Sequence, residues 1–122
     1  MSTTEIERAV EFYNKASIAE EKGEMDLAEV YYLKSWGVFE RVGGKYYPNA
    51  ANALNALAFL RASRGDYAGA LRSAKQSVQI MEAHKTQFAS HDADLIHRQA
   101  WELINHLIGC ETQLQRLAPG IG

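Results

Sequence analysis

The chain has 122 residues, of which 47% are hydrophobic and 23% charged, and its formal net charge is −2. These values predict one small globular domain, and they lack the overall basic charge of a nucleic-acid-binding protein. No apolar run approaches the ~18 residues that a membrane span needs, so we expect neither a nucleic-acid nor a membrane partner. A polar N-terminus and a single cysteine, Cys110, predict a cytoplasmic protein without an internal disulfide.

The first part of the chain predicts a helical hairpin over about residues 4–43. Two capping boxes, in which a Thr or Asp and a later Glu satisfy each other's free backbone N–H groups, mark the helix starts. They are Thr4-x-x-Glu7 and Asp26-x-x-Glu29. The first helix is expected over about 5–22 and ends at Gly23, and the second runs through Val42 to the Gly43-Gly44 pair.

A second hairpin is predicted over about residues 48–86. Its first helix opens at or just after Pro48, because proline is tolerated in the first turn of a helix. Gly65 can adopt the left-handed conformation that closes a helix, and Asp66 can then act as the N-cap of the next one. That helix is expected from Tyr67 to about His84 or Lys85.

A loop of roughly six residues follows, and Ser90 or Asp92 is expected to cap a last helix over about 91–117. One apolar stripe runs along this helix: Ile96, Ala100, Leu103, Leu107, Cys110 and Leu114. Residues 119–122 are expected to form a disordered tail. No stretch alternates in the manner of a strand, so the sequence predicts a single all-α domain over residues 1–118.

The two hairpins are similar to each other. The position numbers of Gly23 and Gly65 differ by 42 (65 − 23 = 42), and so do those of Ala28 and Ala70 (70 − 28 = 42). A fixed period of this length is typical of repeat proteins. The pattern of small residues, a Gly–acid pair and a further Ala resembles tetratricopeptide repeats over about residues 8–86. The segment PNAANALNALAFLRASRGDYAGAL, residues 48–71, resembles the longer repeats of kinesin light chain.

This resemblance implies an α–α superhelix, a right-handed solenoid of two hairpins that the last helix caps. It also implies a non-catalytic adaptor or scaffold, without a cofactor, that binds a peptide segment of another protein in a concave groove. The first helix of each hairpin and the last helix would line that groove. The implied groove residues are Val10, Tyr13, Asn14, Ser17, Glu20, Asn52, Asn55, Phe59, Ala62, Arg98, Trp101, Glu102 and Asn105. Asparagine amides would bind the peptide backbone, and the aromatic rings its side chains.

The chain departs from the family patterns in two places. Kinesin-light-chain-like repeats carry two adjacent asparagines where this chain has Asn55-Ala56. The lysine, asparagine and arginine set that grips C-terminal carboxylates in chaperone-binding members is also absent, because Tyr13, Ser17 and Ala56 stand at three of its positions. A receptor for chaperone tails is therefore disfavoured.

Two other functions remain open at this point. The chain could form a homo-oligomer through apolar residues expected to be exposed, namely Tyr46, Tyr47, Phe88 and Ile108. It could also be an enzyme that uses Cys110 with His106, four residues earlier on the same helix. A buried structural cysteine is the favoured interpretation, because reactive thiols need exposure and an electropositive setting, so no enzymatic activity is expected.

Histidines and arginines complete the candidate sites. His91, Asp94 and His97 are spaced by three, but three residues without a fourth ligand make a weak metal site, so we expect surface histidines and no metal. Four cations gather around the second hairpin. They are Arg61, Arg64, Arg72 and Lys75. A solvated outer face is the favoured interpretation, and a patch that binds an acidic peptide or RNA is the alternative.

Overall fold

The computed structural model describes residues 2–88 and 91–117, and the predicted tail lies outside them. The predicted all-α fold is confirmed: these residues form five α-helices and one 3₁₀ turn, and no strand occurs among them. The elements are α1 (Ser2–Glu21), α2 (Met25–Val42), η1 (Gly44–Tyr46), α3 (Tyr47–Ser63), α4 (Tyr67–Ala83) and α5 (His91–Leu117).

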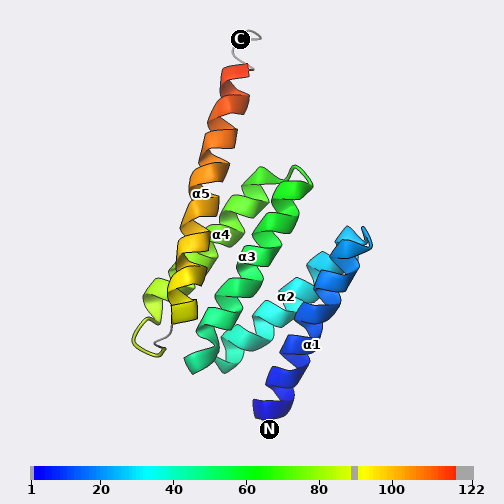
Figure 1. The fold of residues 1–122 in the computed structure, drawn as a ribbon, viewed down its shortest axis with the longest axis vertical. Helices are drawn as coiled ribbons and strands as arrows, with labels where there is room; N and C mark the ends of the chain where they lie inside the picture. The colour runs from blue at the N-terminus through cyan, green and yellow to red at the C-terminus, as the bar shows by residue number, and fades with distance from the viewer. Residues whose placement is uncertain (1, 89–90, 118–122) are drawn as a thin grey trace.

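The helices stack as two antiparallel hairpins followed by a single helix (Figure 1). α1 packs on α2, α3 packs on α4, and α2 packs on α3 to join the hairpins. α5 packs on both helices of the second hairpin and continues beyond them towards the C-terminus (Figure 1). Because the hairpins are stacked in the same sense, α1, α3 and α5 run in the same direction and form one layer, with α2 and α4 behind them.

Both hairpins turn at the same kind of corner. Gly23 and Gly65 have φ angles of +80° and +83°, and an added Cβ would meet no atom within 4 Å, so backbone conformation alone favours glycine. The N–H of Glu24 donates to the carbonyl of Ala19 at 2.8 Å, and the N–H of Asp66 donates to that of Arg61 at 2.9 Å. Each bond spans five residues, as in a Schellman motif, which stops the helix at the glycine.

The helix starts agree with the sequence only in part. The Asp66 cap is confirmed, because its carboxylate accepts a bond from the Gly69 N–H at 2.9 Å. The first predicted capping box is wrong, because α1 already begins at Ser2 and Thr4 lies inside it. The second is also wrong: α2 begins at Met25 without a side-chain cap, and both box carboxylates bind arginines of α3. A local pattern cannot reveal a partner more than thirty residues away.

The two hairpins are joined by a tight connection. Gly43 has a φ of +66°, and a Cβ there would lie 2.8 Å from the Tyr47 hydroxyl oxygen, so both conformation and space require glycine. The Tyr47 ring is stacked on that of His84, with 3.7 Å between the ring centroids. Tyr47 therefore connects the start of α3 to the end of α4.

Small residues allow the helices of each hairpin to approach closely. Ala16 and Ala28 in the first hairpin, and Ala58 and Ala70 in the second, are all fully buried. Larger apolar side chains fill the space around them, among them Leu54, Leu57 and Leu60 of α3, which have at most 1% of their surface exposed. The small positions that defined the repeat in the sequence therefore lie in the core.

One polar contact also repeats between the hairpins. The hydroxyl of Ser35 in α2 donates to the carbonyl of Ala9 in α1 at 2.9 Å, and both residues are buried. The hydroxyl of Ser77 in α4 donates in the same way to the carbonyl of Ala51 in α3 at 3.1 Å. The two donors, like the two acceptors, have the same separation along the chain as the corner glycines, so the two hairpins have the same helix–helix register.

Candidate functional site

A hydrogen bond between Tyr13 and Asn52 links α1 to α3. The Asn52 Nδ2 donates to the Tyr13 hydroxyl oxygen at 3.4 Å, and both side chains are half-buried. Because the two helices run in the same direction, this bond fixes their relative height. Residues an equal number of positions beyond Tyr13 and Asn52 therefore lie level with each other.

A network of polar side chains from α1 and α2 surrounds Tyr13. The Tyr32 ring of α2 contacts that of Tyr13 edge-on, with 5.4 Å between centroids. The Tyr32 hydroxyl donates to the Glu20 Oε1 at 2.9 Å and lies 3.3 Å from the Ser17 Oγ. Since its only hydrogen goes to Glu20, it accepts from Ser17. The sequence named Tyr13, Ser17 and Glu20 but missed Tyr32, which is reached only from the second helix.

This network perturbs both phenols. Burial raises the pKa of Tyr32 to about 12; the Ser17 bond opposes the rise, and the negative charge of Glu20 adds to it. Burial also raises the pKa of Tyr13, where the Asn52 bond opposes the rise and Glu20 again adds to it. The charge of Glu20 is therefore felt at both rings.

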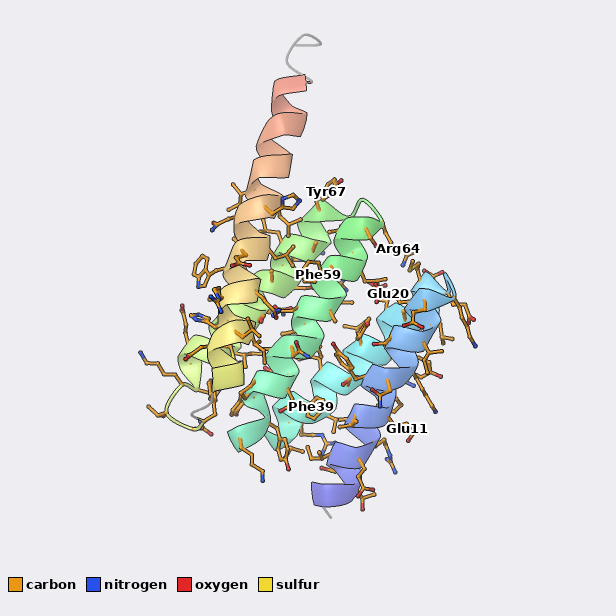
Figure 2. All side chains as sticks on the ribbon, viewed as in Figure 1. Glu11, Glu20, Phe39, Phe59, Arg64 and Tyr67 are labelled. Atoms are coloured by element: carbon orange, nitrogen blue, oxygen red, sulfur yellow. The ribbon has the colours of Figure 1, made fainter. Side chains whose placement is uncertain are left out.

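Phe59 is the most exposed large apolar side chain of this region. With 54% of its surface accessible, it lies on α3 two turns beyond Asn52 (Figure 2). Asn14 of α1 is also exposed. Both placements leave the side chains available to a ligand, but neither by itself shows that they bind one.

Asn55 does not occupy an open groove as predicted. Only 3% of its surface is exposed, and its Nδ2 donates to the carbonyl oxygen of Ile96 in α5 at 3.1 Å. Its Oδ1 is buried without a hydrogen-bond partner. The prediction is wrong because α5 covers the side of α3 that carries Asn55, and the amide attaches α5 to the second hairpin.

The buried residues of α5 show which residue of α5 corresponds to which residue of α3. Leu57 and Arg61 face the first hairpin from α3: Leu57 belongs to its core cluster, and Arg61 bonds to Glu29. In α5, Ala100 and Ile104 face the preceding hairpin in the same way, because they belong to a core cluster with residues of α4. The position numbers differ by 43 in both cases (100 − 57 = 43 and 104 − 61 = 43), so the longer loop before α5 lengthens the period by one.

Of the predicted α5 residues, Trp101 lies on the side of the helix next to α4. Trp101 borders a cavity of about 240 Å³ between α4 and α5, which Val78 and Ile104 also line. Arg98 and Asn105 are exposed, and at three residues before and four after Trp101 they share its side of the helix. This register of α5 on α3 differs by about three residues from one that would place Arg98 and Asn105 level with Asn52 and Phe59. The register of α5 on α3 instead assigns Leu95 and Glu102 to the levels of Asn52 and Phe59. Both are exposed.

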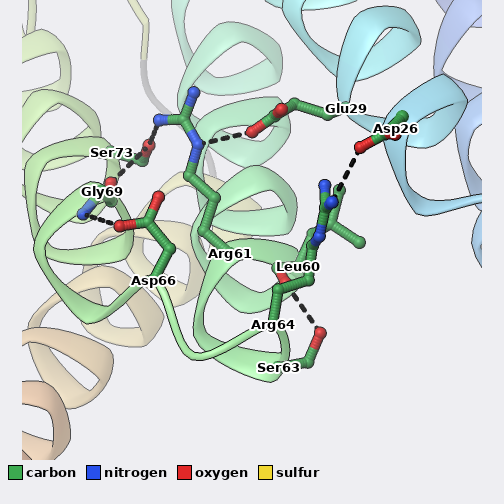
Figure 3. Close-up of polar contacts among 9 residues, drawn as sticks. All are labelled: Asp26, Glu29, Leu60, Arg61, Ser63, Arg64, Asp66, Gly69 and Ser73. Atoms are coloured by element: carbon green, nitrogen blue, oxygen red, sulfur yellow. Dashed lines mark hydrogen bonds and ion pairs between the residues drawn. The ribbon is translucent and has the colours of Figure 1, made fainter.

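Two of the four predicted surface cations are ion-paired. The Arg61 Nε bonds to the Glu29 Oε1 at 2.8 Å, and its Nη1 donates to the Ser73 Oγ at 2.8 Å (Figure 3). The Arg64 Nη2 lies 2.7 Å from the Asp26 Oδ1 (Figure 3). The solvated-face interpretation is therefore wrong for Arg61, which holds α3 against α2. Arg64 is exposed, although it pairs with Asp26. Arg72 and Lys75 are exposed.

The apolar residues named for self-association are mostly packed. Tyr46 and Tyr47 contact the first core cluster, and Phe88 contacts a small cluster that includes Met81. All three are half-buried. Only Ile108, with 46% of its surface accessible, is as exposed as that prediction required.

The candidate metal and catalytic residues are only partly described. The His97 Nε2 lies 3.4 Å from the Glu82 Oε1 of α4, which places this histidine in a contact between helices. Among the described side chains, no three His, Cys, Asp or Glu residues are grouped so as to hold a metal ion. The side chains of His91 and Cys110 lie outside those the structure describes.

Repeated hairpins with small residues at each crossing, and a layer of parallel first helices, define a helical repeat protein. The model of the tetratricopeptide repeat family matches residues 7–83, which span nearly all of both hairpins. The chain belongs to the tetratricopeptide repeat family, whose members are generally non-catalytic modules for protein–protein interaction. No curated protein and no solved structure was found to match the chain. The likeness to kinesin light chain stays a prediction.

The match also confirms the expected fold class. None of the helices in the described segments is long and apolar enough to cross a membrane. α5 lies beyond the matched residues, which agrees with its different register and its longer preceding loop.

Proposed function

We propose that this protein is a non-catalytic adaptor or scaffold that binds a peptide segment of another protein across the exposed side of α1, α3 and α5. The observation that carries the proposal is the exposed Phe59 ring, which lies two turns along α3 from the hydrogen-bonded Tyr13 and Asn52. An exposed aromatic ring gives a large contact area at low cost in conformational entropy. The polar groups of Tyr13 and Asn52 can exchange hydrogen bonds with a peptide backbone.

The structure modifies the set of residues proposed to bind. Tyr13, Asn14, Ser17, Asn52 and Phe59 stay in the proposed groove. Asn55 leaves it because its amide is buried beneath α5. On α5, Glu102 stays in the proposed groove, and Leu95 takes the place of Arg98, Trp101 and Asn105. A cytoplasmic location is part of the proposal, supported by the single cysteine of the chain.

The proposal is tested by selecting binders from a library of random dodecapeptides on the intact chain. The affinity of the selected peptides is then measured for Phe59→Ala and for Tyr67→Ala. Tyr67 is the matched control, because it is an exposed aromatic residue at the start of α4, away from the proposed groove (Figure 2). Truncation of a central aromatic contact is expected to weaken binding by about tenfold or more, and truncation of Tyr67 to have little effect.

Two results would refute the groove. One is a library that yields no binder on the folded chain, and the other is a set of selected peptides that bind Phe59→Ala as tightly as Tyr67→Ala. Light scattering of the unbound protein belongs to the same experiment. A stable dimer that dissociates as peptide is added would mean that the exposed surface also serves self-association.

A further inference from the structure

Two acidic residues, Glu20 of α1 and Glu102 of α5, lie at about the level of Phe59. Tyr13 and Asn52 are hydrogen-bonded across α1 and α3, and Glu20 and Phe59 each follow seven residues later. Seven residues are close to two helical turns, so Glu20 and Phe59 lie on the same sides of their helices as that bonded pair and at the same height. Figure 2 labels both residues, Glu20 on α1 and Phe59 on α3.

A second carboxylate lies at the same level on the other side of Phe59. With the offset of 43 residues between α3 and α5, the residue of α5 that corresponds to Phe59 is Glu102, which is exposed. Three residues earlier on the three helices stand Ser17, Ala56 and Gln99, which carry no charge. Arg98, four residues before Glu102, is an exposed cation one turn away on α5. The middle of this surface therefore consists of an aromatic ring with one acidic residue on each side.

The arginines at the end of α3 do not neutralise these carboxylates. Arg61 and Arg64 are committed to Glu29 and Asp26 of α2. Glu20 forms no ion pair with any side chain that the structure describes, and it accepts a hydrogen bond from the Tyr32 hydroxyl. That bond fixes the carboxylate from below, so the group is held in place for a ligand at little further entropic cost.

We propose that this surface is selective for a basic segment, in which Lys or Arg side chains lie beside Glu20 and Glu102 and a side chain between them contacts Phe59. The inference rests on the proposed function and specifies its ligand. A guanidinium or ammonium group binds carboxylates through charge-assisted hydrogen bonds, and its alkyl stem or charge is attracted to an aromatic face. An acidic segment would meet two like charges beside the ring.

The helix spacing also predicts the pattern in the ligand. α3 and α5 pack on each other, whereas α1 and α3 are linked through the Tyr13 and Asn52 side chains, so α1 and α5 are separated by two spacings of about 10 Å or more, or about 20 Å in total. An extended chain covers about 3.3 Å per residue, which places the two basic residues about six positions apart. The reach of the long side chains broadens this spacing by one or two positions.

The experiment compares the peptides selected by four proteins: the wild-type chain, Glu20→Gln, Glu102→Gln and Glu11→Gln. Gln retains the shape of Glu and an oxygen that can accept the Tyr32 bond, so Glu20→Gln removes charge without removing that contact. Glu11 is the matched control: it lies on the opposite side of α1 from Tyr13 and Glu20, where it pairs with Lys15 (Figure 2).

Wild-type protein and Glu11→Gln are expected to select peptides enriched in Lys or Arg at two positions about six apart. Each groove variant is expected to lose the enrichment at one of them. A selected peptide in which citrulline replaces one arginine is expected to bind wild-type protein about tenfold more weakly and the matching Gln variant with unchanged affinity.

The outcomes separate the two proposals. If no protein selects peptides, both the groove and its basic ligand are wrong. If peptides are selected that depend on Phe59 but show no basic enrichment, or if Glu20→Gln and Glu102→Gln select the same peptides as Glu11→Gln, the groove stands and its selectivity for a basic segment is refuted.

Discussion

Arg61 offers a sharp test of how the hairpins are held together. Its guanidinium bonds to Glu29 of the first hairpin and to Ser73 of the second, each at 2.8 Å. One turn away, the Arg64–Asp26 pair has an equally short contact of 2.7 Å. The pairs differ in exposure, because 21% and 30% of the Arg61 and Glu29 side chains are accessible, compared with 37% and 91% for Arg64 and Asp26.

Exposure therefore decides the expected energies. Exposed ion pairs contribute about 0.2–1 kcal/mol, whereas buried hydrogen bonds to charged groups contribute about 1.5–3 kcal/mol. Since water reaches about a quarter of the Arg61–Glu29 pair, we expect a coupling energy of about 1 kcal/mol there and below about 0.5 kcal/mol for Arg64–Asp26. Arg61→Met, which keeps the apolar stem but also loses the Ser73 bond, is expected to cost about 2 kcal/mol.

Two double-mutant cycles measure these values by urea unfolding followed by helical circular dichroism. The first uses Arg61→Met and Glu29→Gln, and the second Arg64→Met and Asp26→Asn. Each cycle is run at low and at high salt, which should reduce the exposed coupling more strongly. Equal couplings in both cycles, or a larger one for Arg64–Asp26, would refute the argument that burial determines the strength of these contacts.

Three further changes test the core. Ala70→Leu should overpack the α3–α4 crossing and lower the free energy of unfolding by about 1–3 kcal/mol, whereas Ala68→Leu on the exposed side of α4 should change it by less than about 0.5 kcal/mol. Equal urea midpoints would contradict the small-residue crossing. Ser77→Ala removes the bond to the Ala51 carbonyl and should cost about 1 kcal/mol in the same assay, and an unchanged midpoint would show that this bond adds no stability. The folded-state pKa of Tyr32, about 12, lies above the ordinary 10.0, so its contribution to stability is present below pH 10 and is lost as the pH rises towards 12. Tyr32→Phe should therefore lose less stability between about pH 9 and 11 than wild type, and parallel slopes would argue against a buried phenol.

The repeat architecture could be predicted from the sequence because its signals are local and occur twice. Gly23 and Gly65 need a positive φ, and both adopt it. Ala28 and Ala70 leave room for a neighbouring helix, and both are fully buried. The serine-to-carbonyl bonds were not predicted, although the two serines have the same separation as the two glycines, because a serine can also lie on a solvated face.

Two failures of the sequence-based predictions share one physical cause, namely distant partners. Asp26 and Glu29 have the spacing of a capping box, but α2 begins one residue before Asp26, and both carboxylates contact arginines at the C-terminal end of α3 instead. Asn55 has the position of a groove residue, but α5 covers it. Trp101 was misplaced because the loop before α5 changed the period by one residue, which the spacing of apolar residues alone did not resolve.

The shared register of the serine bonds has a consequence for how such a chain can change in length. The glycine corner and the serine–carbonyl bond recur after one repeat period, and both are formed within one hairpin. A segment of one full period added at a corner would carry its own turn and its own internal hydrogen bond. The number of helices that face a ligand can therefore grow by one for each added segment, while the geometry within the existing hairpins stays the same.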